Sequence, residues 1–234
     1  MKRILFVVMV ALGALPVWGQ TPDDDAIRAE VFNPGSQYYY APLLSRYMKG
    51  DTTLTAADYH HLYYGFAMQD QYRPLDPIPA EVDVLTIFDR AGLEMTKEDA
   101  EKVVFYGEQV MLRDPFSPTN INFMTYAYGV LGDAEKERIS ASRMAGVLGV
   151  IASSGDGLKE NTPWHVIFFS HVNDFLGTKG LAARSRRVVT RSVEYVTLAE
   201  PDRKVKGYYF DFGRAYSKPP EVMPEKQKGL HPNL

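Results

Sequence analysis

The chain has 234 residues, of which 45% are hydrophobic and 24% are charged, a composition that excludes disordered, collagen-like and coiled-coil proteins. Its formal net charge of −3 at pH 7 gives the whole chain no electrostatic attraction to nucleic acid, so we expect no nucleic-acid partner. It contains no cysteine, which excludes disulfides, thiolate metal sites, a cysteine nucleophile and the lipidated cysteine of a bacterial lipoprotein.

Residues 1–19 have the features of a secretory signal peptide. Lys2 and Arg3 supply the positive charge, residues 4–15 form an apolar run, and Val17 and Gly19 are small enough for a cleavage site. We therefore predict cleavage after Gly19 and an exported mature protein, periplasmic or extracellular. The apolar run is too short for a comfortable membrane span, and we expect no transmembrane span in the mature protein.

Residues 20–28 are polar and include the acidic run 23–25, so we expect a solvated, mobile lead into the mature chain. Apolar residues at helical spacing then predict six helices within residues 36–152, at about 38–49, 55–66, 81–91, 96–113, 118–131 and 134–151. Thr55 and Thr96 each stand three residues before an aspartate, a pattern related to the capping box, and Gly132 suits a helix C-cap.

A glycine-rich break at residues 153–157 ends the helical part. Beyond it, β-branched and aromatic runs predict strands at 166–169, 187–198 and 206–212, with a short helix at 172–176. A turn at Pro201-Asp202 makes the last two strands a hairpin. The predicted fold class is α+β, one domain over residues 20–217 in which helices (about 36–152) precede a small antiparallel sheet (about 164–213). Residues 218–234, rich in proline and lysine, are expected to form a mobile tail.

One stretch resembles the tetratricopeptide repeat. Pro115 matches the terminal proline of a repeat, Ala127 and Tyr128 match the small and aromatic positions of the next helix, and Leu131-Gly132 matches its turn. The match covers little more than one repeat, and a single repeat has no neighbours to stack on. The resemblance therefore implies a helical hairpin from residues 97–113 and 118–131, without the peptide groove of a repeat array.

A second resemblance covers nearly all of the mature chain. The matching segments are 38–40, 43–55, 62–66, 153–157, 165–167 with Ser170-His171, and 207–210. Together they are similar to an exported bacterial family known as domain of unknown function 4919. The resemblance implies no activity, since the family has no assigned chemistry.

The best candidate for a functional surface is the loop between the last long helix and the first strand, together with the histidines that follow it. Glycines at such a junction leave backbone amides free to meet a ligand. The alternative is a helix C-cap and an Asx-turn that only redirect the chain. The candidate ligand-binding residues are Ser154, Gly155, Asp156, Gly157, Trp164, His165 and His171.

The five histidines do not suggest a metal centre, and we expect neither a metal nor another cofactor. His60 and His61 are adjacent, so on a helix they point about 100° apart and are badly placed to share one ion. The chain has no zincin-type motif, and the serines near residue 154 do not lie in a nucleophile-elbow sequence. The catalytic residues, if there are any, are therefore not identified.

We predict a non-enzymatic protein-interaction or ligand-binding module whose partner is another envelope protein or a glycan or peptide ligand. The alternative is a hydrolase of envelope or dietary polymers with its site at the helix–sheet junction, where His165, Asp156 and a serine would converge. A basic run that includes Lys179, Arg184 and Arg191 has two interpretations. It either protects an exposed strand edge or binds a polyanion such as an acidic glycan.

Overall fold

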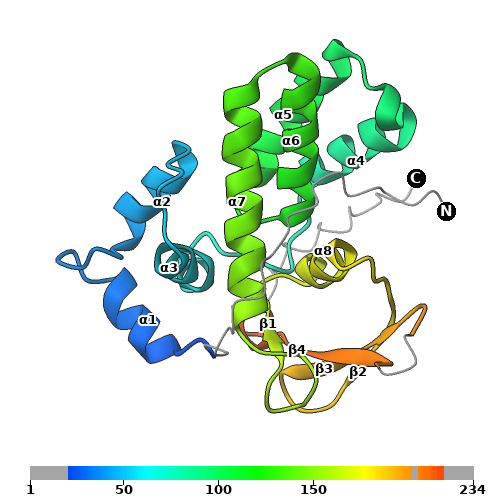
Figure 1. Ribbon diagram of the computed structural model, residues 1–234. Coiled ribbons are helices and arrows are strands. Elements are labelled where there is room, and N and C mark those ends of the chain that lie inside the picture. The colour runs from blue at the N-terminus through cyan, green and yellow to red at the C-terminus, as the bar shows by residue number, and fades with distance from the viewer. Residues whose placement is uncertain (1–20, 202–204, 219–234) are drawn as a thin grey trace, which may run out of the picture.

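The computed structural model describes residues 21–201 and 205–218, so the predicted signal peptide and residues 219–234 lie outside the described part. Within these residues seven α-helices precede the first strand, and the sheet lies at the C-terminal side (Figure 1), which confirms the α+β class. The helices are α1 (Asp24–Val31), α2 (Tyr40–Met48), α3 (Ala56–Phe66), α4 (Pro79–Ala91), the 3-10 turn η1 (Gly92–Glu94), α5 (Lys97–Met111), α6 (Pro118–Leu131), α7 (Ala134–Ser153), α8 (Ser170–Thr178) and α9 (Gly213–Tyr216). The strands are β1 (Trp164–His165), β2 (Ala183–Val188), β3 (Val193–Leu198) and β4 (Gly207–Asp211).

The six predicted helices correspond to α2–α7, and their ends follow from the local signals. Thr55 and Thr96 both form complete capping boxes, in which the threonine and the aspartate three residues later exchange hydrogen bonds. Gly132 ends α6 with φ at +78°, a conformation that costs glycine little. These boundaries were predictable because each depends on residues within one turn of the helix end.

Helix α1 corrects the prediction that residues 20–28 form a solvated lead. The Asp23 carboxylate accepts hydrogen bonds from the amides of Asp25 and Ala26, both 3.0 Å away, and so caps the helix. Ile27 and Val31, one turn apart, are buried in the core. The acidic run therefore begins a helix, because carboxylates are favourable at a helix N-terminus.

The sheet is four-stranded, in the order β1-β4-β3-β2. The predicted hairpin is confirmed as the antiparallel pair β3–β4, and β2 adds to it antiparallel. The two-residue strand β1 pairs parallel with β4, so the sheet is mixed rather than wholly antiparallel.

Two strand predictions were wrong in position. Residues 166–169 are not a strand, and Val166 and Ile167 are buried in the connection between β1 and α8. The run 187–198 is divided by a turn, in which the amides of Val189 and Thr190 both donate to the carbonyl of Val193. In both places apolar residues of the run are buried, as predicted, but a short apolar run does not determine the backbone conformation.

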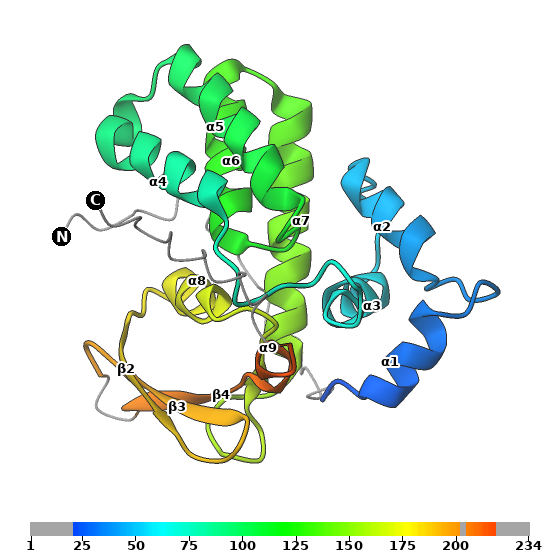
Figure 2. The same ribbon diagram turned by 180° about the vertical axis from the view of Figure 1, so that it is seen from behind.

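Helix α7 stands between the α1–α3 group and the hairpin of α5 and α6, and its C-terminal end reaches the sheet (Figures 1 and 2). In the hairpin, Asn120 donates to the carbonyl of Gly107 at 2.9 Å. Ala127 is fully buried and packs in one cluster with Ala100 and Val103 of α5, as its small size in the predicted hairpin implies.

Candidate functional site

Ser154 fastens the end of α7 to the first strand. Its hydroxyl donates to the carbonyl of Ile151 at 2.7 Å and accepts from the amide of His165 at 2.8 Å. The residue is 1% exposed, so its hydroxyl is enclosed by the protein. Ser154 therefore positions the backbone of His165.

The loop after Ser154 is held by contacts within itself and with the sheet. Asp156 accepts from the amide of Leu158 at 2.9 Å and from the hydroxyl of Thr162 at 2.6 Å, and these bonds, the Thr162 bond foremost, lower the pKa of its carboxyl. Gly157 has φ at +66°, and a Cβ there would come within 2.6 Å of the Trp164 ring. A Cβ on Gly155 would overlap the carbonyl oxygen of Pro163. Both glycines are thus required by close packing.

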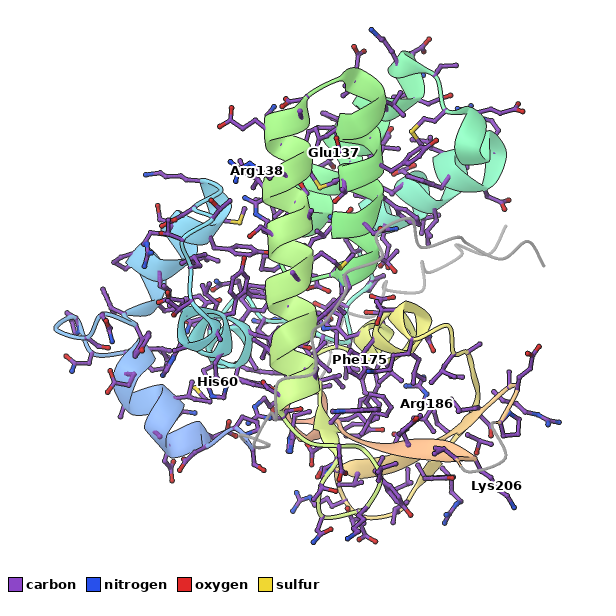
Figure 3. The ribbon with its side chains drawn as sticks, in the orientation of Figure 1. His60, Glu137, Arg138, Phe175, Arg186 and Lys206 are labelled. Carbon is purple, nitrogen blue, oxygen red and sulfur yellow. The ribbon has the colours of Figure 1, made fainter. Side chains whose placement is uncertain are left out.

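Trp164 is buried in an aromatic cluster between α8 and the sheet. Its ring lies 4.8 Å from Phe175, 4.8 Å from Tyr208 and 5.4 Å from Phe210, measured between ring centroids. Phe175 points from α8 toward the sheet (Figure 3). The ammonium of Lys179 lies 5.5 Å from the centroid of the Trp164 ring.

His171 belongs to a buried hydrogen-bonded chain rather than to a pocket. Its Nδ1 is 2.8 Å from the Tyr63 hydroxyl, and its Nε2 is 3.0 Å from a carboxylate oxygen of Asp114. His171 is 0% exposed, and the Tyr63 hydroxyl also accepts from the amide of Ile167 at 3.4 Å. Both ring nitrogens have hydrogen-bond partners. These hydrogen bonds therefore connect α3, α8 and the turn before α6.

His165, by contrast, lines an open pocket of about 500 Å³ between α1, the end of α3 and the β4–α9 junction. The lining residues are Pro22, Asp24, Arg28, Ala67, Met68, His165, Asp211, Gly213, Arg214, Ser217 and Lys218. His165 and His171 therefore have different surroundings, and Asp156 is bonded to its own loop and does not line this pocket.

The imidazole of His165 is mostly buried, and its Nδ1 has no hydrogen-bond partner among the described residues. The nearest carboxylate oxygen, on Asp211, is 3.8 Å from Nδ1, beyond hydrogen-bond reach. Burial lowers the pKa of His165 to about 4, although the negative charge of Asp211 opposes the shift. The ring is thus neutral at neutral pH and has one nitrogen without a partner.

The charged groups around the pocket are unequally paired. Arg214 binds Asp24 through Nη2 at 2.6 Å and Nε at 3.0 Å, and its guanidinium lies 4.7 Å from the centroid of the Tyr64 ring. Asp211 accepts from the Ser192 hydroxyl and from the amide of Gly213, both at 2.8 Å.

Two cations at the pocket have no such partner. Arg28 and Lys218 make no ion pair with a carboxylate of the described residues. Arg28 has only its distant approach to the Phe32 ring, at 5.9 Å. Since Arg214 and Asp24 neutralise each other and Asp211 carries one negative charge, Arg28 and Lys218 leave the described lining with a net charge of about +1 beside a neutral imidazole.

Sequence reasoning found His165 but missed Asp24, Arg28, Asp211, Arg214 and Lys218. These residues come from the two ends of the described chain, and no local pattern connects them. Among residues 21–201 and 205–218, no group of three or more histidines, aspartates or glutamates is arranged to hold a metal ion. None of the helices in that part is long and apolar enough to cross a membrane.

Comparison with known families identifies the family of this chain. The model of a family described as a domain of unknown function (DUF4919) matches residues 25–219, which confirms the resemblance found in the sequence. No curated protein and no solved structure matches the chain.

Proposed function

The chain belongs to a family described as a domain of unknown function (DUF4919), and we propose from its pocket that it is an exported, non-enzymatic binding protein for a small organic anion. The observation that carries the proposal is the unpaired positive charge of Arg28 and Lys218 in a pocket of about 500 Å³ that is also lined by His165. Pockets of this size hold small ligands through an apolar wall and a few well-placed polar groups.

A carboxylate-bearing ligand fits these groups best. The two cations attract the carboxylate and outnumber Asp211, the one carboxylate of the described lining that has no arginine or lysine partner. Ala67, Met68 and Pro22 of the lining supply apolar contact. An acidic sugar and an acidic amino acid of a peptide both carry this chemistry, which agrees with the predicted glycan or peptide partner.

The proposal includes export because residues 1–19 have the features of a signal peptide. The charged start, the apolar run and the small residues before position 20 have the order of a signal peptide. N-terminal sequencing of the protein from the culture medium or periplasm is expected to begin at Gln20. An intact Met1 on membrane-bound material would contradict this part of the proposal.

Calorimetric titration tests the pocket. Glucuronate represents the glycan and N-acetylglutamate the peptide, and glucose and N-acetylglutamine are their uncharged counterparts. We expect at least one of the two anions to bind and neither neutral compound to bind. The double variant Arg28→Gln/Lys218→Gln is expected to weaken binding about tenfold, since two charge-assisted contacts are lost. Lys49→Gln/Lys97→Gln removes two cations outside the pocket and serves as the control.

The alternative, a hydrolase, has one observation in its favour: His165, Asp211 and Ser217 all line the same pocket. The Ser217 hydroxyl donates to the carbonyl of Arg214 at 2.7 Å, however, so it is engaged within its own turn. Turnover of p-nitrophenyl acetate or a p-nitrophenyl glycoside that disappears in both His165→Gln and Ser217→Ala would establish the hydrolase. If no anion binds and no turnover occurs, the pocket is not the functional site.

A further inference from the structure

Strand β2 forms an open edge of the sheet. It pairs with β3 on one side, and no other described strand lies on its second side. Residues 184–188 are all exposed, and Val188 is 63% exposed. A strand of six residues with a free side is long enough to pair with another extended chain.

The backbone groups on the free side can be assigned from the register. The amide of Val189 donates to the carbonyl of Val193 at 2.9 Å, and in an antiparallel pair such bonded positions alternate along the strand. The bonded positions of β2 are therefore Ser185 and Arg187. The N–H and C=O groups of Arg186 and Val188 point to the open side, where no described residue pairs with them.

Four arginines accompany this edge in a chain that is acidic overall: Arg184, Arg186, Arg187 and Arg191. None has a carboxylate within ion-pair distance among the described residues. Arg186 lies between the sheet and α8 (Figure 3), with its guanidinium 5.6 Å from the centroid of Phe169. Arg187 stands opposite Tyr195 on the other face, so both faces of the edge carry positive charge.

We propose that β2 is the docking edge for an extended acidic segment of a partner protein, which adds to the sheet as a further strand. The open amides supply backbone hydrogen bonds, and the arginines select side-chain carboxylates on the added strand. A second copy of the same edge would place arginine opposite arginine, which disfavours self-pairing. An acidic polysaccharide would bind the arginines but has no peptide groups to pair with the open amides. A peptide can bind both the arginines and the backbone amides of the edge, and is therefore the better fit.

Binding of a fluorescent octapeptide of alternating threonine and glutamate tests this proposal. The peptide is expected to bind the protein and to bind less tightly as salt increases, whereas the threonine–lysine peptide is not expected to bind. Val188→Pro removes an outward N–H without breaking a bond to β3, and we expect affinity to fall about threefold to tenfold. Val188→Ala keeps that N–H and is the matched control.

Two further experiments distinguish backbone strand pairing from attraction by charge alone. Arg184→Gln/Arg187→Gln/Arg191→Gln is expected to abolish binding, whereas Lys49→Gln/Lys97→Gln/Arg138→Gln, with the same change in charge far from the sheet, is not. A peptide N-methylated at every residue has no backbone N–H on either of its edges and cannot add to the sheet as a strand, so it is expected not to bind, a test that leaves the protein unaltered. Equal binding of the methylated peptide, or heparin binding that Arg184→Gln/Arg187→Gln/Arg191→Gln abolishes without any binding of the acidic peptide, would overturn strand addition. None of these results depends on the pocket at His165.

Discussion

The guanidinium of Arg214 on α9 holds the carboxylate of Asp24 on α1, although 190 residues separate them in the chain. The Arg214 side chain is 10% exposed, and it lies over the Tyr64 ring of α3. One side chain thus joins α1, α3 and α9 at the pocket. The pocket exists because these three elements meet.

Two substitutions that break this ion pair are expected to destabilise the protein to different extents. Asp24→Asn should lower the free energy of unfolding by only about 0.5–1 kcal/mol, because Asp24 is 56% exposed and solvent screens the pair. Arg214→Met also removes the contact with the Tyr64 ring and should cost about 1–3 kcal/mol. Urea denaturation measures both. Asp25→Asn, which removes the same charge from the same helix turn, is the control, and an equal loss there would assign the effect to the helix dipole.

Tyr63, His171 and Asp114 are linked by buried hydrogen bonds, so we expect the loss of a single hydroxyl there to lower the stability of the fold. Tyr63→Phe removes one hydroxyl and leaves His171 Nδ1 and the amide of Ile167 without a partner. We expect a loss of about 1–3 kcal/mol in the free energy of unfolding. Tyr209→Phe removes a hydroxyl that makes no hydrogen bond with the described residues and should change stability by less than about 0.5 kcal/mol. Equal stabilities of the two variants would show that the buried hydroxyl contributes nothing.

Acid is expected to destabilise the protein through His60 and His165, two buried histidines. Burial lowers the pKa of both His60 and His165 to about 4, so between pH 6.5 and 4 the unfolded chain binds more protons than the folded one. Stability therefore falls as pH falls through that range, by up to about 3 kcal/mol for a fully shifted histidine.

Unfolding by urea at several pH values measures this slope. His165→Gln should remove part of the dependence between pH 6.5 and 4, and His60→Gln/His165→Gln should remove more. If His165→Gln retains the full dependence, the imidazole is protonated in the folded protein at a higher pH than its burial implies.

Asp156 separates the two interpretations of the loop at residues 153–164. Its carboxylate holds Leu158 and Thr162, so Asp156→Ala should lower the free energy of unfolding by about 0.5–2 kcal/mol. Asp156→Asn keeps an acceptor oxygen and should cost less. Because Asp156 does not line the pocket, binding of glucuronate or N-acetylglutamate should be unchanged. Stability that holds while anion binding is lost would instead assign Asp156 to the ligand.

The local parts of the fold were predictable from neighbouring residues. Thr55 and Thr96 marked the starts of two helices, and Gly132 marked the end of another, because a helix end is completed by residues within one turn. The position of α1 was not predicted, although Asp23 was a visible cap. Only two apolar residues of α1, Ile27 and Val31, face the core, too few to show a helical period in the sequence.

By itself, then, the sequence determined the α+β class, the helices α2–α7, the hairpin β3–β4 and the family. The tertiary structure decided the rest: β1 pairs with β4 across 46 residues of chain, and the pocket joins Asp24 to Arg214 around His165. Helix caps and hairpin turns result from interactions between residues close in the chain, which a sequence displays directly. The pocket results from contacts between distant segments, whose free energy appears only when the core of α1, α3 and the sheet has formed.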